Sequence, residues 1–147
     1  MWGCFMTGTP ANVRAIGRCL CGAVRFSIRG PLRSSAVACH CTTCRKFTGG
    51  LWVGTCARRE HVVIARGDTL KWYRSSAEAQ RGFCGNCGSS LFWEGDDEAL
   101  WSIAAGSLDE PTGLSLAVHS WTEESADYWS FDPAIPKMPG PSGLREP

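Results

Sequence analysis

The sequence lacks an apolar run long enough to cross a membrane and has no strong excess of either charge. None of its apolar runs approaches the roughly 20 residues that a transmembrane helix needs. The formal net charge of the 147 residues is +1, so charge gives no indication of a nucleic-acid or membrane partner. The first ten residues have neither a basic start nor a sustained apolar stretch, unlike a secretory signal peptide. These absences favour a soluble cytoplasmic protein whose oligomeric state the sequence leaves open.

Cysteine, in contrast, is abundant. The chain has nine cysteines, an odd number, whereas disulfide-rich secreted domains tend to carry even numbers that are well spread. Seven of the nine fall into three tight motifs: Cys19-x-Cys21, Cys39-x-Cys41-x-x-Cys44 and Cys84-x-x-Cys87. Tight motifs are suited to holding a metal ion rather than to bridging distant segments. The sequence therefore predicts metal-bound thiolates in a reducing compartment.

The remaining pattern predicts a mainly β protein made of short, packed antiparallel sheets. Val24, Phe26 and Ile28 alternate with polar neighbours, which is the period of a half-buried strand. Six further segments fit short strands: Leu51 to Thr55, His61 to Ala65, Thr69 to Tyr73, Ser90 to Trp93, Ala99 to Ala104 and Leu114 to His119. Only Cys41 to Thr48 fits a short helical turn, which Gly49 would end.

A chain of this length is expected to form a single domain. We expect an N-terminal extension at residues 1–15, a zinc-binding domain at 16–139 and a proline-rich tail at 140–147. The stretch from Asp132 to Pro147 holds five of the eight prolines, and it should wrap around the surface or fray.

The first and last cysteine pairs predict one closed zinc site. Cys19 and Cys21 are two residues apart, so in a strand both side chains point to the same face. Cys84 and Cys87 are each followed by glycine, which permits a tight turn that aims backbone N–H groups at sulfur. Four thiolates form the usual tetrahedral site of structural zinc. Free core cysteines, disulfides or a rubredoxin-like iron are the alternatives.

The middle motif offers three thiolates, the number that a catalytic zinc often has before water or substrate completes its coordination. These are Cys39, Cys41 and Cys44. His40 could add a fourth ligand, although an extended Cys-x-Cys segment would direct it away from its neighbours. Cys56 or Cys4 could also close the site, and burial as a small hydrophobic residue is the alternative for Cys56.

Four stretches of the sequence resemble the glutathione-dependent formaldehyde-activating family, which includes centromere protein V. They are Gly17 to Val24, Cys39 to Gly50, Arg81 to Ser89 and Ala105 to Pro111. The resemblance implies a tent-like all-β fold (β-tent) and two Zn²⁺ ions. The structural zinc would lie on Cys19, Cys21, Cys84 and Cys87, and the catalytic zinc on Cys39, Cys41 and Cys44. The implied activity is that of S-(hydroxymethyl)glutathione synthase, a carbon–sulfur lyase, with glutathione and formaldehyde as substrates.

Other residues are candidates for roles around the open site. His119 could protonate the alkoxide that forms when a thiolate adds to an aldehyde, or could be structural. Arg45 and Lys46 could contact glutathione carboxylates, or only offset thiolate charge. Trp52 could line a substrate pocket. The alternative function is a non-catalytic zinc-stapled module that sequesters a thiol or docks a protein.

Overall fold

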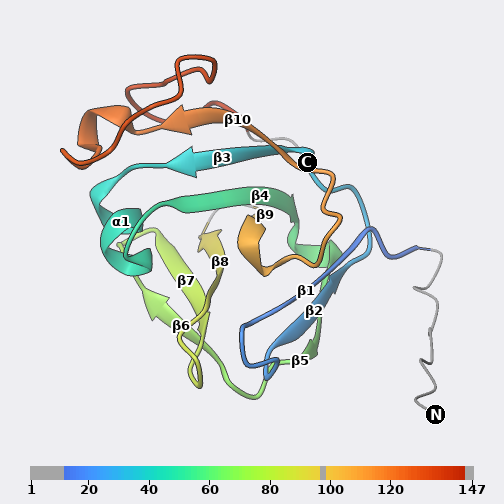
Figure 1. Ribbon diagram of the computed structural model, residues 1–147. Helices are drawn as coiled ribbons and strands as arrows, with labels where there is room; N and C mark the ends of the chain where they lie inside the picture. The colour runs from blue at the N-terminus through green and yellow to red at the C-terminus, as the bar shows by residue number, and fades with distance from the viewer. Residues whose placement is uncertain (1–11, 97–98, 145–147) are drawn as a thin grey trace, which may run out of the picture.

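The computed structural model describes residues 12–96 and 99–144 and arranges them as two β-sheets with a short α-helix (Figure 1). The smaller sheet has the order β1–β2–β5, with β1 at Ala15–Arg18, β2 at Arg25–Ile28 and β5 at Val62–Arg66. The larger sheet has the order β10–β3–β4–β9–β8–β7–β6, formed by β10 at Ser115–Ser120, β3 at Ser35–Cys39, β4 at Trp52–Arg58, β9 at Leu100–Ala104, β8 at Ser90–Gly95, β7 at Ala79–Cys84 and β6 at Leu70–Arg74. The helix α1 covers Thr42–Thr48, and 3-10 turns lie at Arg59–His61, Ala105–Ser107 and Thr122–Glu124.

The mainly β, single-domain prediction is confirmed, with one difference in strand direction. All described pairs are antiparallel except β3 and β10, which are parallel. Residues 40–114, which include α1 and β4 to β9, connect β3 to β10, and parallel strands need a long crossover rather than a tight hairpin. The parallel pair therefore joins segments far apart in the sequence, and the local strand pattern does not reveal it.

The short helix was correctly predicted, and three strands were missed. α1 ends before Gly49, whose backbone has φ 77° and is the left-handed cap that glycine favours. The missed strands are β1, β3 and β7. Their sequences AIGR, SAVAC and AQRGFC are short or contain small and charged residues in place of a clear apolar alternation.

Alternation along the large sheet separates a core face from an open face. Phe92 in β8 and Ile103 in β9 are fully buried and join the core that the small sheet covers. Phe26 of the small sheet meets Phe92 edge to face, with ring centroids 4.9 Å apart, a favoured aromatic geometry. The neighbouring positions Trp93 and Ser102 line a cavity on the opposite face. Because successive side chains of a strand point to opposite faces, the same strands build both the core and the cavity.

The stretch that begins at Asp132 wraps around the surface over its described part, 132–144, which is one of the two outcomes expected. Its residues 136–140 run beside β10: His119 N–H donates to the Pro136 carbonyl, and Met138 N–H donates to the His119 carbonyl. Trp121 N–H also donates to Gly140. The tail thus extends the edge of the large sheet. The predicted boundaries at 15/16 and 139/140 stay predictions, and residues 1–11 and 145–147 lie outside the described residues.

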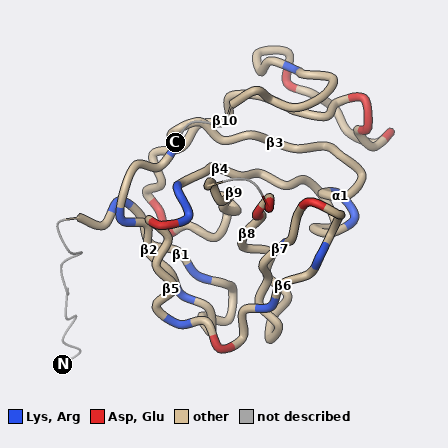
Figure 2. Tube along the Cα trace, turned by 180° about the vertical axis from the view of Figure 1, so that it is seen from behind, with Lys and Arg blue, Asp and Glu red and all other residues tan. Residues whose placement is uncertain are grey.

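Charges are spread over the molecule. Lys and Arg positions occur on both sheets and their loops, with Asp and Glu between them (Figure 2). Within the described ranges, no helix is both long enough and apolar enough to span a bilayer.

Candidate metal centres and cavity

The four-cysteine cluster consists of Cys19, Cys21, Cys84 and Cys87. Their Sγ atoms all lie within 4.8 Å of one another. Two of the separations are 3.6 Å, between Cys19 and Cys21, and 3.8 Å, between Cys21 and Cys84. Ligands at the usual Zn–S distance of about 2.3 Å would be about 3.8 Å apart in a tetrahedron, whereas a disulfide needs about 2.05 Å. The sulfur positions therefore fit a tetrahedral metal ion and do not fit disulfides.

Hydrogen-bond donors surround this cluster. Val24 N–H donates to Cys19 Sγ at 3.2 Å, and the Asn86 side-chain amide donates to Cys21 Sγ at 3.5 Å. The Ser89 hydroxyl lies 3.2 Å from Cys87 Sγ, and this hydrogen bond lowers the pKa of Cys87 to about 5. Donors of this kind stabilise thiolates and orient metal ligands. Because Cys19 and Cys21 follow β1 and Cys84 ends β7, the cluster links the two sheets.

The three-cysteine cluster, Cys39, Cys41 and Cys44, lies where β3 passes into α1. Its Sγ atoms also fall within 4.8 Å of one another. Cys41 is the N-cap of α1, and its sulfur accepts the Cys44 N–H at 3.3 Å, as a serine oxygen does at other helix starts. Positions 41 and 44 share a helix face, so the local turn alone brings their sulfurs together. The three donors fit a zinc ion that keeps one coordination position for another ligand.

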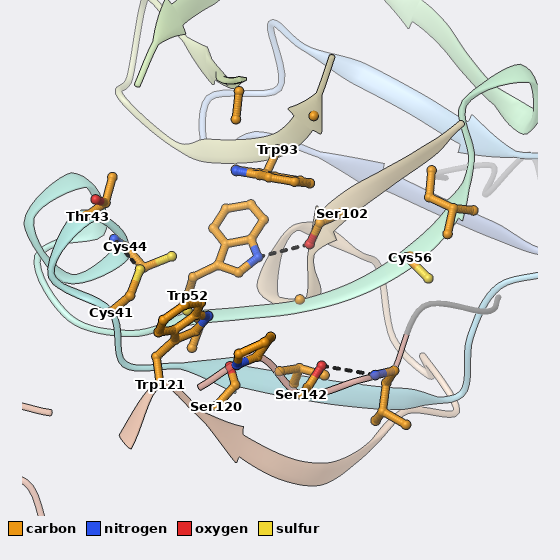
Figure 3. Close-up of a pocket in the computed structure, with 18 of the residues that line it drawn as sticks. Cys41, Thr43, Cys44, Trp52, Cys56, Trp93, Ser102, Ser120, Trp121 and Ser142 are labelled. Carbon is orange, nitrogen blue, oxygen red and sulfur yellow. Dashed lines mark hydrogen bonds between the residues drawn. The ribbon is translucent and has the colours of Figure 1, made fainter. Parts of the chain in front are cut away.

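This cluster opens into a cavity of about 880 Å³ on the outer face of the large sheet. Figure 3 shows Cys41 and Cys44 at one end and Cys56 at the other, with Trp52 and Trp93 between them. The distance from Trp52 to Cys56 along β4 is about 13 Å at about 3.3 Å per residue. Small-molecule sites typically have volumes of about 300–1,000 Å³, so a tripeptide-sized thiol would fit.

The charges at the cysteine end favour a thiolate. Hydrogen bonds from the Cys39 and Cys44 thiols, with a smaller contribution from the nearby Arg81 cation, lower the pKa of Cys41 far below its ordinary value. The same cysteines raise the pKa of Cys44. Arg81 itself donates from Nη2 to Cys44 Sγ at 3.4 Å. Sequence reasoning assigned no role to Arg81, although it is a charged residue within a strand next to a cysteine pair.

His119 is not among the residues that line the cavity, and its role as a proton donor stays a prediction. It is 4 % exposed and lies behind the cluster, where its Nδ1 is 2.8 Å from His40 Nε2. His40 is 1 % exposed, and it points away from the sulfurs as strand alternation predicts. Burial lowers the pKa of both imidazoles. Phe131 packs against both rings, so the pair joins the cysteine loop to β10 and to the segment around Phe131.

Arg45 and Lys46 also lie outside the cavity, although the sequence placed them next to the open site. Successive helix residues are about 100° apart around the axis, so Cys44 can face the cavity while the next two residues cannot. Arg45 borders a small void beside His40 and Trp129, and Lys46 is exposed. Trp52, the third predicted substrate contact, does line the cavity, and its indole N–H donates to the Ser102 hydroxyl at 3.0 Å.

The sequence offered Cys56 and Cys4 as further residues that could close the open site. Cys56 is buried at the far end of the cavity and is not part of the three-cysteine cluster. Cys4, the other residue that could have closed the open site, lies outside the described residues.

Comparison with known proteins gives a consistent family assignment. The family model for the glutathione-dependent formaldehyde-activating enzyme matches residues 14–124. The chain is 34% identical over 80 residues to an uncharacterized lyase of Schizosaccharomyces pombe, covering 52% of this chain and 55% of that protein. It is 29% identical over 83 residues to a putative glutathione-dependent formaldehyde-activating enzyme of Halomonas elongata, covering 52% and 53%. The matched region thus spans about half the length of these curated relatives.

A solved structure supports the fold. A crystal structure of a Rhodobacter sphaeroides protein superposes with a TM-score of 0.57 at 20% sequence identity. The match covers 83% of this chain and 98% of that one. At this identity the likeness concerns the fold alone.

Proposed function

The chain belongs to the glutathione-dependent formaldehyde-activating enzyme family, and we propose that it is a zinc-dependent carbon–sulfur lyase that forms or cleaves a thiol–aldehyde adduct. Glutathione and formaldehyde are the first candidate substrates, with S-hydroxymethylglutathione as the adduct. This proposal draws on the names of the family and of the two curated relatives, one described as a lyase and one as a formaldehyde-activating enzyme.

The observation that carries the proposal is the three-cysteine cluster at the end of a cavity. A cluster serving only stability would be closed by four ligands, as the four-cysteine cluster is. Here three sulfurs converge at the wall of an 880 Å³ cavity that extends away from them along β4. That arrangement supports a catalytic role for Cys39, Cys41 and Cys44, and a structural one for the other four cysteines.

A bound zinc ion would lower the pKa of an entering thiol, so that the thiol would react as a thiolate. In the synthetic direction the thiolate sulfur forms a bond to the aldehyde carbon while the carbonyl π bond breaks, and its electron pair moves to oxygen. That oxygen takes up one proton, replacing the one that the thiol released. Cleavage reverses each step, so no oxidant or reductant is needed.

The residues of this chain would orient the reactants. Trp52 forms an apolar wall beside the sulfurs, and its bond to Ser102 fixes the indole plane. His119 acts, in this proposal, as a positioning residue: through His40 it holds the backbone between Cys39 and Cys41.

The test is exchange spectroscopy on pre-equilibrated glutathione and formaldehyde, because their uncatalysed addition is fast. Zinc-loaded wild-type protein should increase the exchange rate, and Cys41→Ser at equal concentration should not. Cys56→Ser is the matched control, since that cysteine lines the same cavity without belonging to the cluster. Equal exchange rates with wild type and Cys41→Ser, across several thiols and aldehydes, would favour the non-catalytic binding module.

A further inference from the structure

Arg81 is a buried cation whose hydrogen-bonding capacity is only partly used. It lies in β7, is 4 % exposed and lines the cavity next to the three-cysteine cluster. Its Nη2 donates to Cys44 Sγ at 3.4 Å. Its Nε and Nη1 are buried and have no hydrogen-bond partner among residues 12–96 and 99–144. Since buried donors are nearly always paired in folded proteins, these two nitrogens point to a missing acceptor.

The surroundings of Arg81 do not provide that acceptor. The Phe47 ring, 5.5 Å from the guanidinium carbon, offers only a cation–π contact. The carboxylates that line the cavity, Glu78 and Glu124, are on exposed residues. Glu124 already accepts the Thr42 N–H at 2.7 Å, and no described ion pair joins either carboxylate to Arg81. Arg81 therefore lines the cavity near the sulfurs and keeps N–H donors without an acceptor.

We propose that Arg81 binds an oxygen anion of the substrate through Nη1 and the second N–H of Nη2, whose other N–H stays on Cys44. The anion has two possible sources: a carboxylate carried by the thiol, or the alkoxide oxygen that forms when the thiolate adds to the aldehyde. Arginine suits either, because its charge is permanent and its planar fork binds oxygen anions through parallel hydrogen bonds. This inference deepens the proposed function and rests on it.

Two features separate this role from neutralisation of thiolate charge. A charge partner for Cys44 needs only the Nη2 contact, which leaves the other two nitrogens unexplained. The second arginine of the cavity, Arg33, shows the contrast: its guanidinium donates to the carbonyl oxygens of Ser35 and Leu144, at 2.9 and 2.6 Å. Arg33 is therefore occupied by backbone acceptors and lies toward the far end of the cavity.

The binding experiment uses two thiols that differ by one charge, 3-mercaptopropionate and its methyl ester. Tryptophan fluorescence of the zinc-loaded protein gives their dissociation constants, since Trp52, Trp93 and Trp121 line the cavity. If the anion is the carboxylate, wild type should bind the acid about 10- to 100-fold more tightly than the ester, the range of a charge-assisted hydrogen bond. Arg81→Gln should lose that preference and Arg33→Gln should keep it.

The exchange experiment adds formaldehyde to protein that is saturated with the methyl ester of 3-mercaptopropionate. If the anion is the alkoxide, Arg81→Gln should slow adduct exchange at least about tenfold, with both dissociation constants and the zinc content unchanged. The inference would be overturned if folded, zinc-loaded Arg81→Gln kept the wild-type preference for the acid over the ester and also the wild-type rate of adduct exchange.

A further variant is needed in case Arg81→Gln loses its zinc. If Arg81→Gln loses zinc, Arg81→Lys decides, because its single nitrogen can restore the charge beside Cys44 but not the fork. Wild-type behaviour of Arg81→Lys would reduce Arg81 to a charge partner and overturn the inference, whereas reduced preference or exchange would support it. Failure of the proposed function looks different: wild type would then catalyse no exchange, while the binding experiment would still report on Arg81.

Discussion

Replacing an exposed sulfur should cost this protein much of its stability, if a metal ion links the two sheets. Cys21 is exposed, and an exposed substitution ordinarily changes the free energy of unfolding by about 0.5 kcal/mol or less. Cys21 and Cys84, however, are 63 positions apart. Treated as a cross-link that closes such a loop, the four-cysteine cluster contributes roughly 4 kcal/mol of chain entropy. The three-cysteine cluster closes only the segment from Cys39 to Cys44, worth about 2 kcal/mol on the same scale.

The assay is urea unfolding of zinc-loaded protein at one fixed free zinc concentration, because bound metal shifts apparent stability by mass action. Cys21→Ser should lose roughly 4 kcal/mol, and the half-buried Cys41→Ser about 2 kcal/mol or less. Zinc analysis on the same samples shows which ion is missing. Equal losses for the two variants, or a loss below about 0.5 kcal/mol for Cys21→Ser, would refute the assignment of the four-cysteine cluster as the structural cross-link.

Three further outcomes are expected. Protein purified without chelator should contain close to two zinc ions per chain by elemental analysis, and iron in their place would contradict the donor assignment. Gly17→Val should lower the free energy of unfolding in urea by about 2 kcal/mol or more, because a Cβ at this position would lie 2.3 Å from the Phe26 ring. Gly50→Ala is the control and should be nearly neutral, because the space around Gly50 is open. Burial lowers the pKa of His119 in the folded protein, so the unfolded chain binds a proton on this imidazole more readily. The free energy of unfolding should therefore fall as the pH drops below about 6.5, the ordinary pKa of histidine. In His119→Gln this decrease should be less steep.

The sequence predicted the two cysteine clusters because their chemistry is local. Within the middle motif, alternation and one helical turn suffice to gather three sulfurs, and Cys41 caps the helix that carries Cys44. The pairing of the first and last motifs was an inference from ligand number, and the structure brings those four sulfurs within 4.8 Å. The strands that were missed, β1, β3 and β7, are short or contain small and charged residues, so they lack a clear apolar alternation.

The other candidate residues except Trp52 lie outside the cavity. Arg45 and Lys46 adjoin the cluster in sequence, but rotation around the helix removes them from the cavity. His119 reaches the neighbourhood of the cluster through the parallel pairing of β10 with β3, and it arrives on the buried side of that strand. The first outcome follows from helical spacing once Cys44 is known to face the cavity, whereas the second depends on a strand pairing that sequence spacing does not show.

Arg81 shows how strand alternation, once one residue of a strand is placed, locates another residue on the cavity wall. In β7, Ala79 and Arg81 line the cavity, while Gly82 packs against Phe92 and Trp72 on the core side. The register shift between Gly82 and Phe83 leaves its extra residue in β8, so alternation continues along β7 to Cys84, which is buried in the core. Three side chains, from β3, α1 and β7, therefore meet at one point: two sulfurs and a guanidinium. Because a buried cation is costly without acceptors, the position of Arg81 is explained most simply if an anion binds there.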